Sequence, residues 1–290
     1  MRSNRNAIPL LAILALAAAC SGEVDSTGGD GATTTDGTTG DGGTAIDGVI
    51  GSDGSDPGRC GQLVAIVRDF KAHDDGNGHP DFENVNRDEP GYTFDTGAAQ
   101  WTHDPDPYLD TSLDAEGKPK YLLGASNSPE DTIHGETAFS QWYRDVDQVN
   151  MRFEVPIADQ DPADDRFLFD AASLPGGQFF PIDERGFGNE GRAHNYHFTT
   201  ELRGTFRYRG GEQFTFSGDD DVYVFVNGKL ALDIGGVHGV QTGTIDFDAI
   251  AGWLGIAQDN EYEIVLFHAE RHTTRSNFRF ETSIRCLVIN

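Results

Sequence analysis

The feature that most constrains the fold of this chain is a pair of apolar runs joined by Asn227 and Gly228. Residues 222–226 are β-branched or aromatic, and residues 229–234 follow directly after the two-residue connection. High strand propensity on both sides of Asn-Gly predicts a β-hairpin, because Asn and Gly tolerate the positive φ angles of a type I′ turn. The second half of the chain is therefore expected to contain antiparallel sheet.

Alternation of apolar and polar residues predicts strands elsewhere. Further strands are expected at 62–70, 195–202, 212–217, 261–268 and 277–288. Helical periodicity is nearly absent, with one short candidate at 249–254. Residues 71–135 are rich in Asp, Asn, Gly and Pro, which predicts long loops. The pattern as a whole indicates an all-β domain, an antiparallel β-sandwich or jelly-roll-like barrel with long loops.

The N-terminus has the features of an export signal. Two arginines precede an apolar stretch at 7–19, which is shorter than the roughly 20 residues that a transmembrane helix needs. This pattern is typical of a secretory signal peptide, here residues 1–19. The small residues before Cys20 resemble a bacterial lipobox, although Ala17 stands where Leu is usual. The resemblance implies a lipidated Cys20 and an outer-membrane or cell-surface lipoprotein; ordinary signal-peptidase cleavage near residue 19 is the alternative.

Residues 20–59 differ in composition from the rest of the chain. They are rich in Gly, Thr and Asp and have no aromatic residue, so they cannot bury enough apolar surface to fold, and a flexible tether is expected. The folded domain is expected at 60–290. The chain has three cysteines. If Cys20 carries lipid, Cys60 and Cys286 form an even pair in an oxidising compartment, which predicts a disulfide; two free thiols are the alternative.

The charge and the motifs exclude several functions. The net charge of −27 argues against nucleic acid and against anionic lipid at the domain surface, so membrane contact is expected through the lipid anchor alone. It suits divalent cations. The sequence has no Gly-x-Ser-x-Gly, P-loop or His-Glu-x-x-His motif, and no third zinc ligand accompanies His194 and His197. We therefore expect a protein that is not an enzyme; a glycosidase with paired carboxylates is the less favoured alternative.

An acidic run interrupts two expected strands. Asp219, Asp220 and Asp221 follow Gly218 directly. Adjacent carboxylates repel one another, and calcium, which takes about six to eight oxygen ligands, compensates such charge. The alternative is that these aspartates accept hydrogen bonds from turn backbone. His238 follows a glycine-rich turn and is expected to lie on the same rim as the first two aspartates.

In these segments the chain resembles the fibro-slime domain family. The resemblance covers about residues 62–286 and rests on seven segments in the family's order: 79–83, 141–143, 179–181, 194–199, 218–238, 267–272 and 276–282. The hairpin core is in turn similar to the protective-antigen-type β-domain of yeast flocculins and some glycosidases. The resemblance implies an extracellular domain with that β-sandwich fold.

The resemblance also implies a binding site. In the flocculin branch, an Asp-Asp pair joined by a cis peptide bond binds calcium, and the calcium binds sugar hydroxyls. Counted back from the hairpin, that pair corresponds to Asp219 and Asp220, with Asp221 in a supporting or structural role. The loop before the last strand, 271–277, would add Asn277 as a calcium ligand, and His238 and Asn277 would contact the ligand.

The expected function is therefore calcium-assisted, non-catalytic binding of a glycan or of extracellular matrix. The alternative is a structural component of a matrix or of cell–cell contacts, in which calcium only stiffens loops.

Overall fold

The computed structural model of the protein describes residues 62–73, 77–83, 109–122, 133–164, 166–284 and 287. All of them belong to one unit of the chain, residues 48–290. The predicted signal peptide, Cys20, the tether and the predicted disulfide partners Cys60 and Cys286 lie outside the described residues. None of the described helices is long and apolar enough to span a bilayer.

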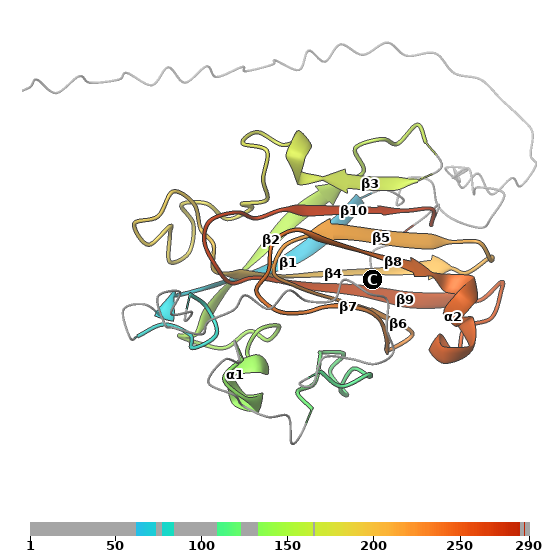
Figure 1. Cartoon of the computed structure of the whole chain (residues 1–290), viewed down its shortest axis with the longest axis horizontal. Helices are drawn as coiled ribbons and strands as arrows, with labels where there is room; N and C mark the ends of the chain where they lie inside the picture. Colours follow the sequence, from blue (N-terminus) through green and yellow to red (C-terminus); the bar gives the residue numbers. More distant parts are fainter. Residues whose placement is uncertain are drawn as a thin grey trace, which may run out of the picture. The chain divides into compact units, whose positions relative to one another are not determined.

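The described residues form two antiparallel sheets (Figure 1). The larger sheet has the strand order β2-β1-β4-β9-β6-β7, and the smaller one has the order β3-β10-β5-β8. The strands of the larger sheet are β1 (Gln62–Phe70), β2 (Asn150–Ala158), β4 (Phe198–Arg207), β6 (Asp221–Val226), β7 (Lys229–Ile234) and β9 (Glu261–Glu270). Those of the smaller sheet are β3 (Phe167–Asp170), β5 (Gln213–Gly218), β8 (Gln241–Asp246) and β10 (Phe278–Thr282). The predicted all-β sandwich is confirmed.

The hairpin predicted around Asn227 and Gly228 is present. These two residues join β6 to β7 with φ angles of 50° and 72°, as a type I′ turn requires. The helical segments that are described over their whole length are α1 (Glu136–Phe139), a 3₁₀ turn at Ala171–Ser173 and α2 (Phe247–Leu254). The side chain of Asp246 caps the N-terminus of α2, and Gly255 ends it with a φ of 68°.

The main core lies between the two sheets. Strand β9 shows how it is built, because its even-numbered residues face the smaller sheet and its odd-numbered residues face away from it. Ile264 and Leu266 pack in the core between the sheets, whereas Val265 and Phe267 belong to a second apolar cluster. The larger sheet is thus buried on both faces in its centre, and all six residues of β6 are buried.

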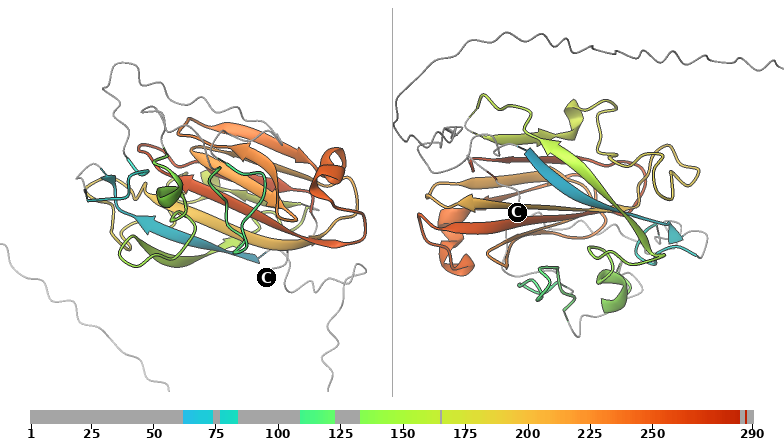
Figure 2. Two further views of the ribbon diagram at one scale, coloured as in Figure 1. Left: turned by 90° about the horizontal axis from the view of Figure 1, so that it is seen from below. Right: turned by 180° about the vertical axis from the view of Figure 1, so that it is seen from behind.

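The second cluster is covered by the loops of the first half of the chain. Phe82, Phe139 and Trp142 from these loops pack against Tyr223 and Phe267 of the sheet. Figures 1 and 2 show α1 and the neighbouring segment 109–122 on the side of the larger sheet that faces away from the smaller one. The described parts of the region predicted as long loops therefore form a third layer together with α1.

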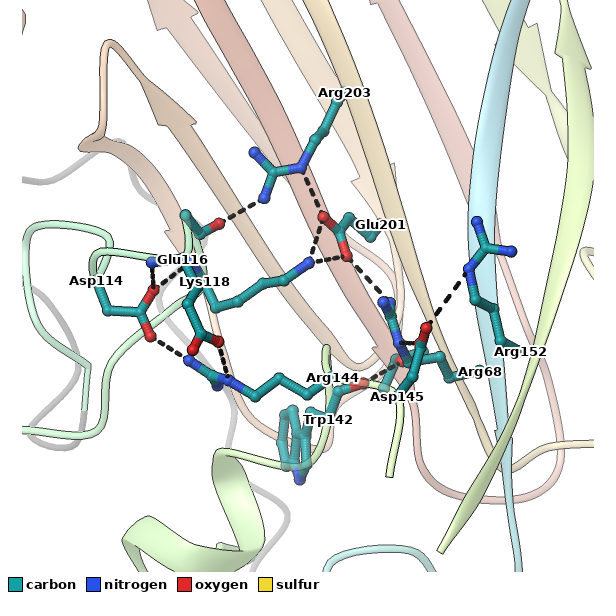
Figure 3. A network of polar contacts seen from close by, with 12 residues as sticks. Arg68, Asp114, Glu116, Lys118, Trp142, Arg144, Asp145, Arg152, Glu201 and Arg203 are labelled. Atoms are coloured by element: carbon teal, nitrogen blue, oxygen red, sulfur yellow. Dashed lines mark hydrogen bonds and ion pairs between the residues drawn. The ribbon is translucent and has the colours of Figure 1, made fainter. Parts of the chain in front are cut away.

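An ion-pair network fastens this layer to the sheet (Figure 3). Glu201 on β4 accepts hydrogen bonds from Lys118 of the covering loop at 2.6 Å, from Arg203 at 2.6 Å and from Arg68 at 3.0 Å. Arg144 pairs with Glu116 within the layer at 2.9 Å. Because Glu201 is almost fully buried, its three cationic partners compensate a charge that would otherwise be costly.

Three strands, β2, β3 and β8, were not predicted from the sequence. All three lie at sheet edges. β2 carries charged residues and Pro156, and β8 carries Gly243, where an added Cβ would lie 2.5 Å from a side-chain carbon of Leu232. These features obscured the strand pattern.

Candidate functional site

A pocket with a volume of about 240 Å³ opens where three connections of the sandwich meet. They are the β5–β6 turn, the β7–β8 connection and the β9–β10 connection, residues 271–277, which we call the pocket loop. The residues that line the pocket are Asp219, Asp220, Val237, His238, Gly239, His272, Thr273, Thr274 and Arg275. The structure therefore places His238 beside the two aspartates, as the sequence predicted; its role in binding stays a prediction.

Asp219 is held by Asn277. The backbone N–H and the Nδ2 of Asn277 both donate to the Asp219 carboxylate, the Nδ2 over 2.6 Å, and the backbone N–H of Asp219 donates to the Asn277 carbonyl at 3.2 Å. Burial raises the pKa of Asp219. The two residues lie 58 positions apart in the sequence, so the structure brings the acidic turn and the pocket loop together, and the role of Asn277 as a calcium ligand stays a prediction.

Asp220 accepts hydrogen bonds from backbone on two sides of the pocket. Its Oδ2 accepts from the N–H groups of Arg271 and His272 at 2.8 and 3.1 Å, and its Oδ1 accepts from the N–H of His238 at 3.3 Å. Its φ of 52° is in the left-handed region, which Asp adopts more readily than most residues. The expectation that a cis peptide bond joins Asp219 to Asp220 is wrong. The described cis peptide bond joins Thr273 to Thr274 instead.

Asp221 points away from the pocket. It is the first residue of β6, and strand alternation directs its side chain to the opposite face from the pocket. Its Oδ2 lies 2.6 Å from Nε of Arg271, and its Oδ1 accepts from Tyr223 and Gly236. Burial opposes ionisation, but Arg271 outweighs it and the pKa of Asp221 is lowered. This placement fits the structural role that the sequence left open for Asp221.

Glu270 is a site residue that the sequence did not reveal. It is the last residue of β9 and its side chain is fully buried near Asp219 and Asp220. Neither of its carboxylate oxygens has a hydrogen-bond partner of normal geometry, and neither does the hydroxyl of Ser276 close by. Burial and then the charges of the two aspartates raise its pKa far above the usual value. The signal in the sequence was its even-numbered position on β9, in phase with the inward-facing Leu266.

The donor chemistry of this cluster suits a hard cation. Among the described residues, no three His, Cys, Asp or Glu side chains have the arrangement of a metal site. Calcium, however, also uses amide, carbonyl and water oxygens, so a site with fewer carboxylates is sufficient. Asp219 and Asp220 supply such oxygens at the pocket surface. Burial and the charges of these aspartates disfavour ionisation of the buried Glu270 beneath them, so a cation bound here would favour its charged form.

His194 and His197 have structural partners. Nδ1 of His194 lies 2.6 Å from Asp183, and His197 lies between two carboxylates, with Nε2 at 3.1 Å from Glu83 and Nδ1 at 2.9 Å from Glu190. The two histidines contact different carboxylates and do not converge on a common point, which agrees with the hydrogen-bonding role that their spacing favours over a zinc site.

No protein-family model matches the chain. The chain is similar to several proteins of Dictyostelium discoideum. It is 33% identical to protein psiR over 185 residues, 59% of this chain and 18% of psiR. It is 32% identical to protein psiD over 235 residues, 77% of this chain and 42% of psiD. The chain thus spans less than half of either relative, and the resemblance to the fibro-slime family stays a prediction.

Solved structures show weaker likeness. A PA14 sugar-binding domain from an RTX adhesin aligns with a TM-score of 0.25 and 17% identity over 31% of this chain and 47% of that one. The PA14 domain of the MpAFP antifreeze protein aligns with a TM-score of 0.26 and 13% identity over 75% of this chain and 78% of that one. Superpositions at these TM-scores do not establish a shared fold or site.

Proposed function

We propose that this chain is an exported, lipid-anchored and non-catalytic binding protein whose pocket holds a glycan through a calcium ion. The observation that supports this proposal is the carboxylate cluster at the pocket. Asp219, Asp220 and Glu270 are all buried, and burial raises the pKa of each of them. Carboxylates whose ionisation is disfavoured in the free protein gain a compensating charge when a divalent cation binds.

Asp219, Asp220 and Asn277 would hold the ion, as the fibro-slime and flocculin resemblance implies. Calcium would supply open coordination positions for the hydroxyl groups of a sugar. His238 lines the same pocket; its Nδ1 lies 2.8 Å from the carbonyl oxygen of Gly239 and its Nε2 3.4 Å from that of Ile234, so contact with the ligand would replace the longer of these two contacts. The pocket volume of about 240 Å³ matches one sugar ring better than a polymer segment, so a terminal or single sugar residue is the expected ligand.

The absence of a catalytic role is part of the proposal. The two carboxylates that line the pocket are adjacent in sequence and both accept backbone hydrogen bonds from the loops around them. A glycosidase needs two carboxyl groups on opposite sides of the scissile bond. Turnover of model glycosides by the purified protein would contradict this part.

Calcium binding is tested by calorimetry on the mature chain. We expect heat of binding at or below millimolar calcium, an increase in melting temperature over the chelated protein, and loss of both effects in Asp220→Asn. Asp147→Asn is the matched control, because Asp147 is exposed and far from the pocket loop in sequence. Absence of binding at millimolar calcium, or equal binding by Asp220→Asn, contradicts the metal role.

Sugar binding is tested on the same sample with a glycan array, with and without chelator. Calcium-dependent capture of glycans supports the proposal. A structural matrix or adhesion component is the second candidate, since buried backbone hydrogen bonds to Asp220 already join the loops. That candidate predicts calcium-dependent thermal stabilisation without sugar capture.

A further inference from the structure

The pocket loop is held by a carboxylate from a distant part of the chain. Glu83 lies 190 positions before Thr273, and its carboxylate accepts hydrogen bonds from the backbone N–H and from the hydroxyl of Thr273, both at 3.0 Å. Nε2 of His272 lies 3.5 Å from the same carboxylate. His272 and Thr273 line the pocket, whereas Glu83 does not. Glu83 therefore contacts the pocket loop from behind.

Glu83 is fixed by its own backbone as well. Its N–H donates to the carbonyl of Arg271, the first residue of the pocket loop, at 2.8 Å. Its φ is 57°, in a region where a Glu residue is strained. Strained backbone that surrounding contacts maintain is found preferentially at binding sites.

His197 connects Glu83 to a third loop. Its ring is 2% exposed and lies between two carboxylates, Glu83 on Nε2 and Glu190 on Nδ1. Glu190 in turn accepts from the backbone N–H of Ala72, at 3.0 and 3.2 Å to its two oxygens. Glu83, His197 and Glu190, which we call the clamp, thus join three connections of the sandwich at the end that carries the pocket.

We propose that Glu83 is the positioning residue of the pocket loop, and that protonated His197 keeps Glu83 in place. A doubly protonated imidazole donates to both carboxylates at once, whereas a neutral imidazole has a single N–H and donates to one of them. Loss of the proton on His197 therefore removes one of the two charge-assisted bonds and loosens the hold on Thr273.

The charges around His197 determine at which pH this happens. Burial lowers the pKa of His197, but Glu190 and Glu83 outweigh burial and the opposing charge of Arg192, so the pKa is raised above 6.5. Asp69 also faces the ring, and His272 faces Glu83. Burial opposes ionisation of Glu83, but the hydrogen bond from His197, the charge of His272 and the N–H of Thr273 lower its pKa to about 2.

The sign of the effect follows from these directions. A raised histidine pKa gives a contribution that is complete below pH 6.5 and is lost as the pH rises through the folded-state value. The lowered pKa of Glu83 gives a contribution that is complete above pH 4.5 and is lost as the pH falls through about 2. The clamp is therefore complete in mildly acidic solution and weakens in alkaline solution.

Hydrogen–deuterium exchange of the mature chain tests the clamp without any ligand. Protection factors are measured for peptides that contain 271–277, at about pH 6, below the ordinary pKa of histidine, and at about pH 8.5, well above it. In the wild type we expect protection to fall by roughly tenfold between the two pH values, as loss of one charge-assisted hydrogen bond predicts.

Glu83→Gln should show weak protection at both pH values, and His197→Gln should remove the pH dependence. Glu116→Gln, at an exposed ion pair within the loop layer, should behave like the wild type.

A second variant, Glu190→Gln, tests the clamp even if Glu83→Gln does not fold. Glu190→Gln leaves Glu83 and the pocket loop unchanged, keeps an amide oxygen that can accept from the N–H of Ala72, and removes the charge that faces Nδ1 of His197, so it should reduce protection of 271–277 by several-fold. Equal protection in the wild type and Glu190→Gln, or protection in the wild type that does not change with pH, overturns the clamp.

If the pocket binds calcium, as the proposed function holds, loss of the clamp should weaken that binding. A calcium titration of the same variants separates the existence of the clamp from the existence of the calcium site. Weaker calcium binding by Glu190→Gln than by Glu116→Gln supports both. If calcium does not bind the wild type, the proposed function fails, and the exchange data alone decide whether the clamp exists.

Discussion

Arg271 and Asp221 form an ion pair that is closed off from solvent. Nε of Arg271 lies 2.6 Å from Oδ2 of Asp221, and the two side chains are 1% and 0% exposed. The guanidinium also lies over the ring of Trp142, 4.8 Å from its centre, and donates to the carbonyl of Asp81. The pair thus connects the acidic turn, the start of the pocket loop and the covering layer.

We expect Arg271→Met to lower the free energy of unfolding by about 3–5 kcal/mol, because it leaves the Asp221 carboxylate buried without its cation. Urea unfolding followed by tryptophan fluorescence measures the change. Arg279→Met is the control, since the pairs of Arg279 with Asp170 and Glu281 are about one-third exposed, and we expect a change below roughly 1 kcal/mol. If both variants lose the same free energy of unfolding, the large effect expected for the buried ion pair is contradicted.

Gly218 allows the acidic turn to approach the pocket loop. A Cβ at this position would lie 2.3 Å from the carbonyl oxygen of Asn277 and 2.6 Å from the ring of Phe216. We expect Gly218→Ala to cost about 1–3 kcal/mol and to weaken calcium binding by displacing Asn277 from Asp219. Gly252→Ala, where the Cβ meets nothing within 4 Å on helix α2, should instead stabilise the protein by about 0.5–1 kcal/mol. Thermal melting should show a lower melting temperature for Gly218→Ala and a higher one for Gly252→Ala, and calorimetry should show weaker calcium binding only for Gly218→Ala.

His268 is buried among aromatic rings, and neither ring nitrogen has a hydrogen-bond partner of normal geometry. Burial lowers its pKa to about 3. Because the unfolded chain binds a proton at this histidine below about pH 6.5 and the folded chain does not, folding stability falls by roughly 1.4 kcal/mol per pH unit as the pH decreases toward 3.

His268→Leu should therefore stabilise the protein at about pH 7 by about 1–3 kcal/mol, by removing a buried imidazole whose nitrogens have no hydrogen bond of normal geometry. The gain should increase by roughly 2 kcal/mol at about pH 5. At that pH the unfolded wild type is protonated at His268 and the folded wild type is not, which favours unfolding, whereas the leucine variant has no such group. Urea unfolding of both proteins at the two pH values measures the difference. A gain that is the same at both pH values would show that His268 is not neutral in the folded state.

The predicted disulfide between Cys60 and Cys286 is tested by peptide mapping of the non-reduced protein. We expect a linked pair of peptides and, after reduction, a loss of about 2–5 kcal/mol, the usual range for a bridge that closes a long loop. A double Cys60→Ser, Cys286→Ser variant should match the reduced protein and be insensitive to reductant. Detection of two free thiols in the exported protein is the contrary outcome.

Lipidation at Cys20 predicts that the exported protein enters the detergent phase on Triton X-114 partitioning. Cys20→Ser should move it to the aqueous phase, because an acyl chain contributes about 0.8 kcal/mol of membrane affinity for each buried methylene and the variant has none. Partitioning of wild type and variant into the same phase would favour cleavage by an ordinary signal peptidase.

Much of the fold follows from local patterns. The predicted strand at 62–70 and the hairpin strand at 229–234 match β1 and β7, since apolar alternation and Asn-Gly act over a few residues. The loop 271–277 also lies between two strands as expected. Strand ends were less accurate: the strand expected to start at 195 begins at Phe198 and runs to Arg207. Here the loop contacts of Asn195 and His197, which no local pattern encodes, set the boundary.

The site was predicted in part. The run Asp219–Asp221 is visible in the sequence because it interrupts two strand patterns, whereas Asn277 was expected only because the family resemblance implied a ligand from that loop. The role of Asp221 was left open between supporting and structural, because it depends on which face of β6 meets Arg271 and the covering layer. Glu270 and Glu83 were missed as site residues for a similar reason, since each acquires its role from loops that are distant in the chain.

The sequence by itself determined the all-β class, the type I′ hairpin and the position of the acidic run, all of which depend on the order of a few neighbouring residues. Only the tertiary structure decided which carboxylates share a pocket, which one is neutralised by an arginine and which one is buried beside other carboxylates with its pKa raised. Those outcomes depend on burial and on distances between loops up to 190 positions apart, and both arise only when the sheets and the covering layer pack together.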